Sequence, residues 1–180
     1  MPLGQVEAGV GQNQYGLIPI TLLQLATGTV PPDAVVVDNF RSYDYTINDN
    51  SDFQFTVPED YLPGTNLTMI MDWACNEAYA LANGEINWRI AWETVATNLT
   101  QAVGTGTAGT VDSGDINIPA VARTLTTVSF TLTAADFAAL DLCRILLTRI
   151  ALVGGVSPTA EPEVYAVNIR YTRRWPYVIR

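Results

Sequence analysis

The sequence of 180 residues contains no histidine and no lysine, and these two absences narrow the chemistry that the chain can perform. Without histidine there can be no Ser-His-Asp or Cys-His catalytic group and no imidazole metal ligand. Without lysine there can be no Schiff base and no phosphate-binding loop of the Gly-Lys type. All nine cationic residues are therefore arginines, whose planar side chains form bidentate pairs at interfaces.

Cysteine is scarce as well. Cys75 and Cys143 are the only two, and both stand among apolar residues. Two cysteines do not make a disulfide framework, so we expect buried free thiols rather than a bond between them. No apolar run is long enough to span a bilayer and no cationic, apolar leader opens the sequence, so we expect neither a membrane segment nor a signal peptide.

The net charge is −9, with 18 acidic residues against nine basic ones. Such a chain lacks the basic surface that nucleic acid phosphates require. The charges are also unevenly placed. Residues 33–60 hold seven acids and only Arg41, whereas residues 164–180 hold four arginines and no acid. The arginine-rich end could be solvated, or it could dock on an acidic surface of a neighbouring subunit, and the sequence leaves both open.

Alternation with a period of two residues is the main structural pattern. In residues 85–95, EINWRIAWETV, the apolar Ile86, Trp88, Ile90 and Trp92 share one parity and mostly polar residues take the other. A strand places such a set on one face, whereas a helix would scatter it around its circumference. Two tryptophans on that face would bury a large area against a second sheet.

Similar segments recur along the chain and predict an all-β protein. An antiparallel β-sandwich of about eight strands, a single jelly roll, fits this pattern best. An immunoglobulin-like sandwich is the alternative, although its Cys-Trp-Cys spacing is missing. In the last strand we expect Tyr165, Val167, Ile169 and Tyr171 to point inward. The expected strands cover residues 35–40, 43–47, 53–57, 67–73, 85–95, 123–132, 142–152 and 163–173.

Between the strands, residues 76–83 are the best candidate for a short helix, and Thr133 could cap a helical turn or two over residues 133–140. Residues 97–115 are rich in glycine and threonine and predict a long loop, which is typical of a functional contact or a mobile segment.

The first residues predict an extended N-terminal arm. Residues 1–16 have little to bury, and Pro19 keeps residues 17–26 out of a central strand. This second stretch should form either an edge strand or a strap on a neighbouring subunit, and we expect residues 1–26 to become ordered on assembly. The expected division is an arm and linker over residues 1–34, a jelly-roll domain over 35–174 and a tail over 175–180.

Paired carboxylates and acidic turns are weak candidates for a site. Glu85 and Glu93 share a strand face but would lie roughly 26 Å apart, too far for a glycosidase pair. Residues 48–52 and the pair Asp112 and Asp115 resemble parts of calcium loops, but polar turns are the simpler interpretation.

Trp73, Trp88 and Trp92 could form a platform on which sugars stack, but their alternating positions favour the core. Exposed aromatics on one concave face would indicate sugar binding, whereas buried Trp88 and Trp92 would favour a capsid role. We expect no catalytic residue, no metal and no cofactor.

Six segments resemble small jelly-roll structural proteins of bacteriophages and related viruses. They lie at residues 53–61, 67–73, 86–88, 122–132, 141–144 and 167–171, within residues 35–172. The resemblance implies a non-enzymatic virion protein, made in the host cytoplasm and located on the capsid surface. It implies a cement or decoration protein that bridges capsid subunits, commonly as a homotrimer. A jelly-roll major capsid protein and a carbohydrate- or receptor-binding module of a phage fibre are the alternatives.

The partners expected on this basis are further copies of the chain and the major capsid protein, with no nucleic acid and no membrane. Interface residues are expected in two segments that lie far apart in the sequence. They are Leu17, Ile18, Ile20 and Leu22 in the first segment, and Arg170, Arg173, Arg174, Trp175 and Arg180 in the second.

Overall fold

The structure is a computed structural model that describes residues 14–78, 84–97, 102 and 106–174. Within these residues the chain forms ten strands, the one-turn helix α1 (Leu22–Leu25) and the short 3-10 turn η1 (Ala134–Asp136). The strands are β1 (Tyr15–Ile20), β2 (Asp33–Val37), β3 (Phe40–Asp44), β4 (Asn50–Thr56), β5 (Leu67–Cys75), β6 (Glu85–Val95), β7 (Thr107–Asn117), β8 (Thr126–Leu132), β9 (Leu142–Ile150) and β10 (Pro162–Thr172).

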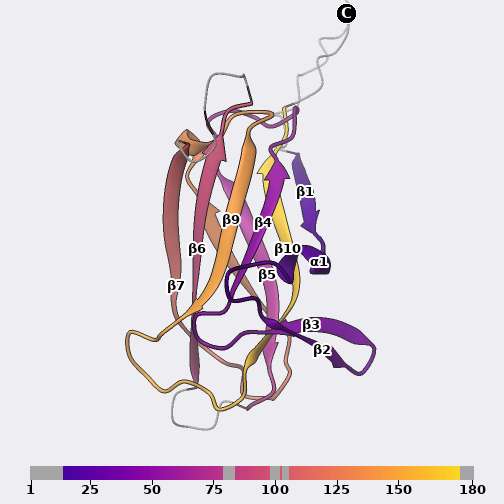
Figure 1. The fold of residues 1–180 in the computed structure, drawn as a ribbon, viewed down its shortest axis with the longest axis vertical. Helices are drawn as coiled ribbons and strands as arrows, with labels where there is room; N and C mark the ends of the chain where they lie inside the picture. Colours follow the sequence, from indigo (N-terminus) through magenta and orange to yellow (C-terminus); the bar gives the residue numbers. More distant parts are fainter. Residues whose placement is uncertain (1–13, 79–83, 98–101, 103–105, 175–180) are drawn as a thin grey trace, which may run out of the picture.

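The strands form two sheets that pack face to face (Figure 1). The six-stranded sheet has the order β2-β3-β10-β5-β8, and β1 also pairs with β10. The four-stranded sheet has the order β4-β9-β6-β7. Neighbouring strands run antiparallel in both sheets.

Strands β3 to β10 make a jelly roll. β6 pairs with β7, β5 with β8, β4 with β9 and β3 with β10, so the pairs are nested like one long hairpin. Successive pairs alternate between the two sheets, which means that the hairpin is rolled up on itself. The predicted antiparallel sandwich of the single jelly-roll type is therefore confirmed, with β1 and β2 as additional strands.

Aromatic side chains between the sheets form the centre of the core. Trp88 on β6 is fully buried and meets Trp73 on β5 edge to face, with 6.4 Å between ring centroids. Tyr45 also meets Trp88 edge to face, with 5.3 Å between ring centroids. Trp92 is only 5% exposed, so the predicted burial of the tryptophans is confirmed.

The prediction of a long loop over residues 97–115 is wrong for residues 107–115, which belong to β7. β7 pairs only with β6 in the described part of the chain, and its Val111 is partly buried. Gly109 lies against the ring of Trp92, where an added Cβ would come within 2.1 Å of the ring. Glycine is required for this close approach. The glycines of this strand are one reason why its sequence predicted a loop.

The inward-facing set of β10 differs from the prediction at two residues. Val167, Ile169 and Tyr171 are buried as expected, but Val164 is also buried and Tyr165 is not. The pairing of β10 with β5 shifts between Val164 and Ala166, which marks a β-bulge. A bulge adds one residue to the strand, so the side chains before it point to the face opposite to the one that strict alternation predicts. Tyr165 therefore lies on the outer face.

Residues 15–25 pack on the sandwich of their own chain. β1 runs along β10, Ile20 and Leu25 are buried in the core, and α1 contacts β4. The edge-strand interpretation therefore holds for residues 15–20, while the ordering of residues 1–26 on assembly stays a prediction. Pro19 is tolerated there because β1 pairs on one side only in the described structure.

The helix predictions have mixed outcomes. Residues 79–83 of the expected helix over 76–83 lie outside the described residues. Residues 134–136 form a single 3-10 turn preceded by Thr133, whose side chain makes no capping hydrogen bond. Thr133 therefore marks the start of the turn but does not stabilise it as a cap.

Replacing Trp88 by alanine should destabilise the protein by about 3–5 kcal/mol, because the change leaves a cavity between the sheets. Urea unfolding followed by tryptophan fluorescence would measure this loss. Val153→Ala is the control, since Val153 is 91% exposed and should change stability by less than about 0.5 kcal/mol. Equal effects of both changes would contradict the central place of Trp88.

Candidate functional site

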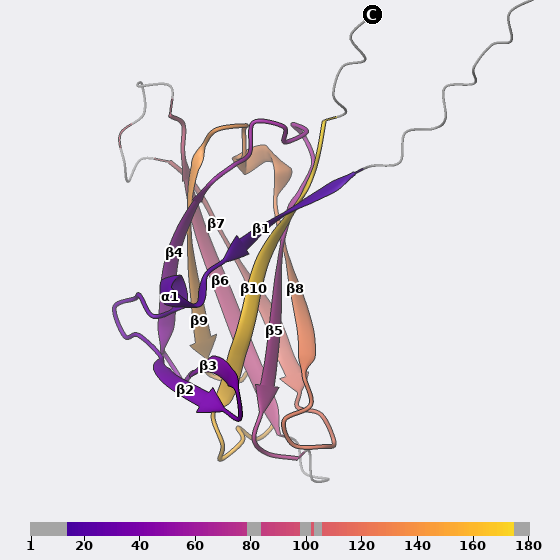
Figure 2. The same ribbon diagram turned by 90° about the vertical axis from the view of Figure 1, so that its right-hand side faces the viewer.

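The two segments predicted to form an interface lie side by side in the fold. β1 pairs with the end of β10 in a register that places Leu17 opposite Arg170 and Ile18 opposite Ile169. The backbone of Arg173 donates a hydrogen bond to the carbonyl of Gln14 at 2.8 Å. The described chain therefore begins and ends at the same corner of the sandwich (Figure 2).

This terminal corner consists of Tyr15, Leu17, Arg170, Arg173 and Arg174, which are all exposed. The guanidinium of Arg170 lies 5.2 Å from the ring centre of Tyr15, as in a cation–π contact. Arg173 lies near Tyr171 and places Nε 3.3 Å from Oδ2 of Asp60.

The other predicted interface residues have different positions. Ile20 is buried in the core, Leu22 and Ile18 pack partly against the core, and Trp175 and Arg180 lie outside the described residues. A pocket of about 190 Å³ opens at the corner and is lined by Tyr15, Asn66, Thr68, Arg170, Tyr171 and Thr172. The corner thus offers apolar, aromatic and cationic groups together.

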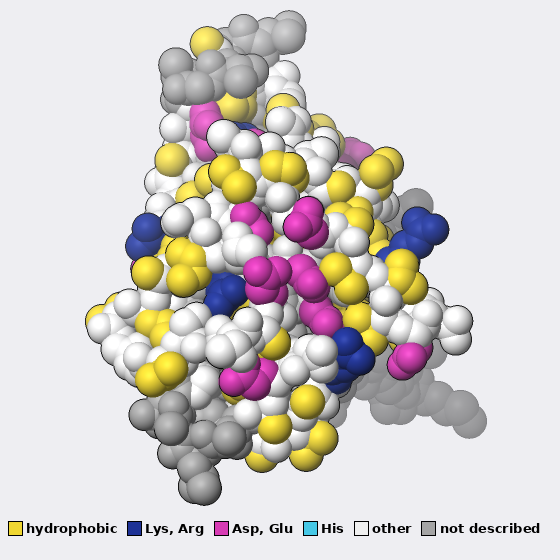
Figure 3. Space-filling view, turned by 60° about the horizontal axis from the view of Figure 1, so that its bottom comes forward, with side chains coloured by type: hydrophobic (Ala, Val, Ile, Leu, Met, Phe, Trp, Pro, Cys, Tyr) yellow, Lys and Arg dark blue, Asp and Glu magenta, His cyan; other side chains and the backbone are white. Residues whose placement is uncertain are grey.

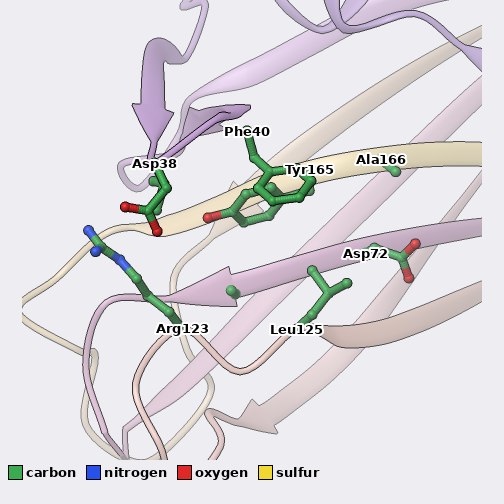
Figure 4. A pocket seen from close by; sticks show the side chains of 9 residues that line it. Asp38, Phe40, Asp72, Arg123, Leu125, Tyr165 and Ala166 are labelled. Atoms are coloured by element: carbon green, nitrogen blue, oxygen red, sulfur yellow. The ribbon is translucent and has the colours of Figure 1, made fainter.

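A larger cavity, the hairpin cleft, lies under the tip of the β2–β3 hairpin and measures about 450 Å³ (Figure 4). The outer faces of β5 and β10 form its floor, and the segment before β8 closes one side. No pattern in the sequence indicates this site. Its lining consists of Val37, Asp38, Phe40, Asp72, Ala74, Arg123, Leu125, Tyr165 and Ala166.

Local features of the chain create the cleft. Asp38 has a φ of 54°, a left-handed conformation that aspartate tolerates in a tight turn, so the hairpin folds back sharply. Only the pairs Glu163–Asp44 and Val164–Tyr43 join β3 to β10, and the hairpin projects from the body (Figure 1). The bulge in β10 then turns Tyr165 outward into the space beneath it.

Three carboxylates lie in a row beside the cleft. Asp33 is paired with Asp44 across β2 and β3, and Asp44 is paired with Glu163 across β3 and β10. Glu163 is only 3% exposed; it accepts a hydrogen bond from the hydroxyl of Tyr165 and lies 3.9 Å from Nε of Arg123. Like charges on directly opposite residues repel each other.

Burial, followed by repulsion from Glu163, Glu161 and Asp33, raises the pKa of Asp44 to about 6. Burial and the contact with Glu163 raise the pKa of Tyr165 to about 12, so this phenol stays protonated at neutral pH. Viewed from the end of the sandwich near the hairpin, acidic side chains gather at the middle of the surface (Figure 3). The hairpin end is therefore acidic.

The acidic turns suggested as calcium loops serve the fold instead. Asp112 accepts two hydrogen bonds from Arg89, at 2.7 and 2.8 Å, which lower its pKa. Asp115 accepts from the backbone of Gly154 at 2.8 Å, and this bond lowers its pKa. Asp49 accepts a hydrogen bond from the backbone N–H of Thr46 at 2.6 Å. Within the described residues no group of three or more Cys, Asp or Glu side chains is placed to hold a metal ion.

Cys75 and Cys143 are both buried free thiols, as predicted. Burial raises the pKa of Cys75 to about 11 and raises the pKa of Cys143 further. Neither thiol therefore forms the thiolate that reacts or binds metals near neutral pH. No helix in the described residues has the length and apolarity of a membrane span.

No protein family and no curated protein matches the chain. Among solved structures it is similar to infectious bursal disease virus, Gx strain, with 11% identity and a TM-score of 0.44 over 98% of this chain and 39% of that one. It is similar to a CBM4 structure, with 14% identity and a TM-score of 0.37 over 79% and 76% of the two chains. The CBM36-1 domain of a multidomain xylanase from the hindgut metagenome of Trinervitermes trinervoides gives 8% identity and a TM-score of 0.40 over 87% and 96%.

The carboxylate row should make stability depend on pH in a specific direction. Because the pKa of Asp44 is raised from 3.8 to about 6 in the folded state, the folded protein binds this proton more tightly than the unfolded chain does. The resulting contribution to the free energy of unfolding is fully present below about pH 4 and is lost as the pH rises through 6. Asp44→Asn should remove this loss. Relative to wild type, the variant should gain about 1–2 kcal/mol between pH 4 and pH 7, after a discount for solvent screening.

Urea unfolding of both proteins at the two pH values would measure this gain. Glu59→Gln removes one exposed acid away from the row and is the matched control. A gain of the same size for Glu59→Gln, or none for Asp44→Asn, would show that the row does not set the pH dependence.

Proposed function

We propose that the chain is a non-enzymatic structural protein of a virion, a cement or decoration subunit that binds the outside of a phage capsid and links its subunits. The terminal corner is the observation that supports this proposal most directly. Two segments from opposite ends of the sequence meet there and expose Leu17, Tyr15 and three arginines.

Arginine and aromatic side chains are enriched in the energetically important parts of protein interfaces. Residues 1–13 and 175–180 continue from the same corner, so they can add contact area to it. Contacts of this kind are individually weak, but a trimer that engages several at once gains avidity from their number. We therefore propose a homotrimer that binds the major capsid protein through its terminal corners.

The charge of the chain agrees with a place on the capsid surface. A net charge of −9 cannot neutralise packaged nucleic acid, so an outer layer suits it better than an inner one. A major capsid protein that forms the shell itself is the alternative within the same class.

A carbohydrate-binding module is a second candidate, and the hairpin cleft is the observation that favours it. Phe40 is 70% exposed and lines the cleft with Tyr165, so aromatic rings are available for stacking against a sugar. The buried Trp88 and Trp92 do not contribute to this surface. Loss of polysaccharide binding in Phe40→Ala would support this candidate.

Two measurements test the proposed function. Light scattering of the purified chain should give a discrete trimer, whereas a monomer would favour a binding module and large closed shells a capsid protein. Immunogold labelling with an antibody against the chain should decorate the outside of intact particles. Particles that contain no copy of the chain would contradict a virion role.

Replacing Arg173 and Arg174 by glutamine should weaken binding to capsids by roughly tenfold or more, because the terminal corner loses two cations. The fold should remain intact, since both residues are exposed. Cosedimentation of the variant with particles that lack the protein would measure the change. The matched control is Arg89→Gln with Arg144→Gln, which removes the same charge from the four-stranded sheet, and a similar loss in both would contradict the assignment.

A further inference from the structure

β10 joins two ends of the molecule that differ in charge. Glu161 directly precedes it and Glu163 lies at its beginning, next to Arg123 of the hairpin cleft. Arg170 lies near its end and Arg173 directly follows it, in the terminal corner. The hairpin end therefore carries more acids than bases even with Arg123 beside Glu163, and the terminal corner keeps Arg170 and Arg174 in addition to the Arg173–Asp60 pair. Two copies placed end to end would bring opposite charges together.

The hairpin cleft has the chemistry of an acceptor site for a short apolar peptide. Phe40 and Leu125 are 70% and 59% exposed although both line the cavity. Ala74, Ala166 and Val37 add further apolar surface, and Figure 4 shows the side chain of Phe40 above the ring of Tyr165 and the carboxylates of Asp38 and Asp72 at the sides. Arg123 also lines the cleft and lies next to Asp38 in Figure 4, which leaves Asp72 as the carboxylate for a cation of the occupant. A segment with aromatic or aliphatic groups and one cation would complement this lining.

Residues 175–180, with the sequence WPYVIR, have this composition. They combine Trp175, Tyr177 and two β-branched residues with the cation Arg180. Residues 1–13, which start from the same corner, contain no aromatic residue and no arginine and carry Glu7 instead. Of the two terminal segments, the C-terminal one therefore matches the cleft and the N-terminal one does not.

The C-terminal segment cannot reach the cleft of its own chain. The amide of Arg174 donates a 2.6 Å hydrogen bond to the carbonyl of Asp60, and Arg173 forms a bridge with Tyr61, so the chain is held in line with β10 up to this point. Arg174 is nine residues beyond Tyr165, which is roughly 30 Å along a strand. Six further residues span at most about 22 Å, so an occupant of this sequence must come from another copy.

We propose that residues 175–180 of one copy bind in the hairpin cleft of the next copy, in a head-to-tail contact. Such a contact uses different surfaces on the two partners, so it closes into a ring or extends into a chain. A ring of three would be the homotrimer. The inference rests on the self-association that forms part of the proposed function, but it does not require a virion.

Mixing two full-length variants tests this contact. Phe40→Ala with Leu125→Ala damages the cleft and keeps the C-terminal segment, whereas Trp175→Ala with Tyr177→Ala damages the segment and keeps the cleft. Each variant alone should be a monomer by light scattering, with association weakened roughly tenfold or more. An equimolar mixture retains one intact cleft and one intact segment per pair, so it should form dimers that neither variant forms alone.

Controls separate the contact from general effects. Phe40 and Leu125 are more than half exposed, so circular dichroism should show an unchanged fold in the cleft variant. Val6→Ala with Val10→Ala alters the N-terminal segment in the same way and should keep the mass of the wild type.

Three results would overturn the inference: a monomeric wild type, a wild-type mass for either variant, or a mixture that stays monomeric. Loss of polysaccharide binding without a change in mass would assign the cleft to a sugar instead. Particles without the chain would refute the virion role alone, because the mixing experiment uses no particles.

Discussion

The contact between the two sheets through Trp73, Trp88 and Tyr45 is the interaction on which the rest of the structure depends. Each ring is fully buried, and the tryptophans come from opposite sheets. A jelly roll has no long helix to cover its sheets, so each sheet must bury its apolar face on the other. This contact holds together the two sheets, to which the nested strand pairs from β3–β10 to β6–β7 belong in alternation.

The rolled hairpin also decides which parts of the chain meet. In the rolled hairpin, β10 lies in the middle of the six-stranded sheet. One edge of β10 pairs with β3 at its beginning and with β1 towards its end. The terminal corner and the hairpin cleft therefore lie at opposite ends of β10. A subunit with an apolar, acidic cleft at one end and arginines at the other is suited to directional contacts between copies.

Sequence patterns predicted most of the strands but failed where glycine or a bulge intervened. They also misplaced the turn between β2 and β3, because the strands expected over residues 35–40 and 43–47 lie at Asp33–Val37 and Phe40–Asp44. β6 was predicted with its observed bounds, because its inward residues are all large and apolar. β7 was missed, since Gly109 lies against the ring of Trp92 where an apolar residue would have marked the strand, and Val111 and Ile116 alone do not make a clear alternation. Tyr165 was placed inward because alternation cannot show that one extra residue reverses it. The interface residues at Leu17 and Arg170 were proposed separately, and their contact required the strand register.

By itself, the sequence determined the class of fold, the buried tryptophans, the two unreactive thiols and the lack of histidine and lysine chemistry, because these depend on composition and on local alternation. The tertiary structure alone decided that β1 lies on β10, that Asp33, Asp44 and Glu163 form one row, and that Phe40 and Tyr165 share a cleft. Each of these pairs segments that lie far apart in the sequence, and such pairing follows from how the hairpin is rolled rather than from any local pattern.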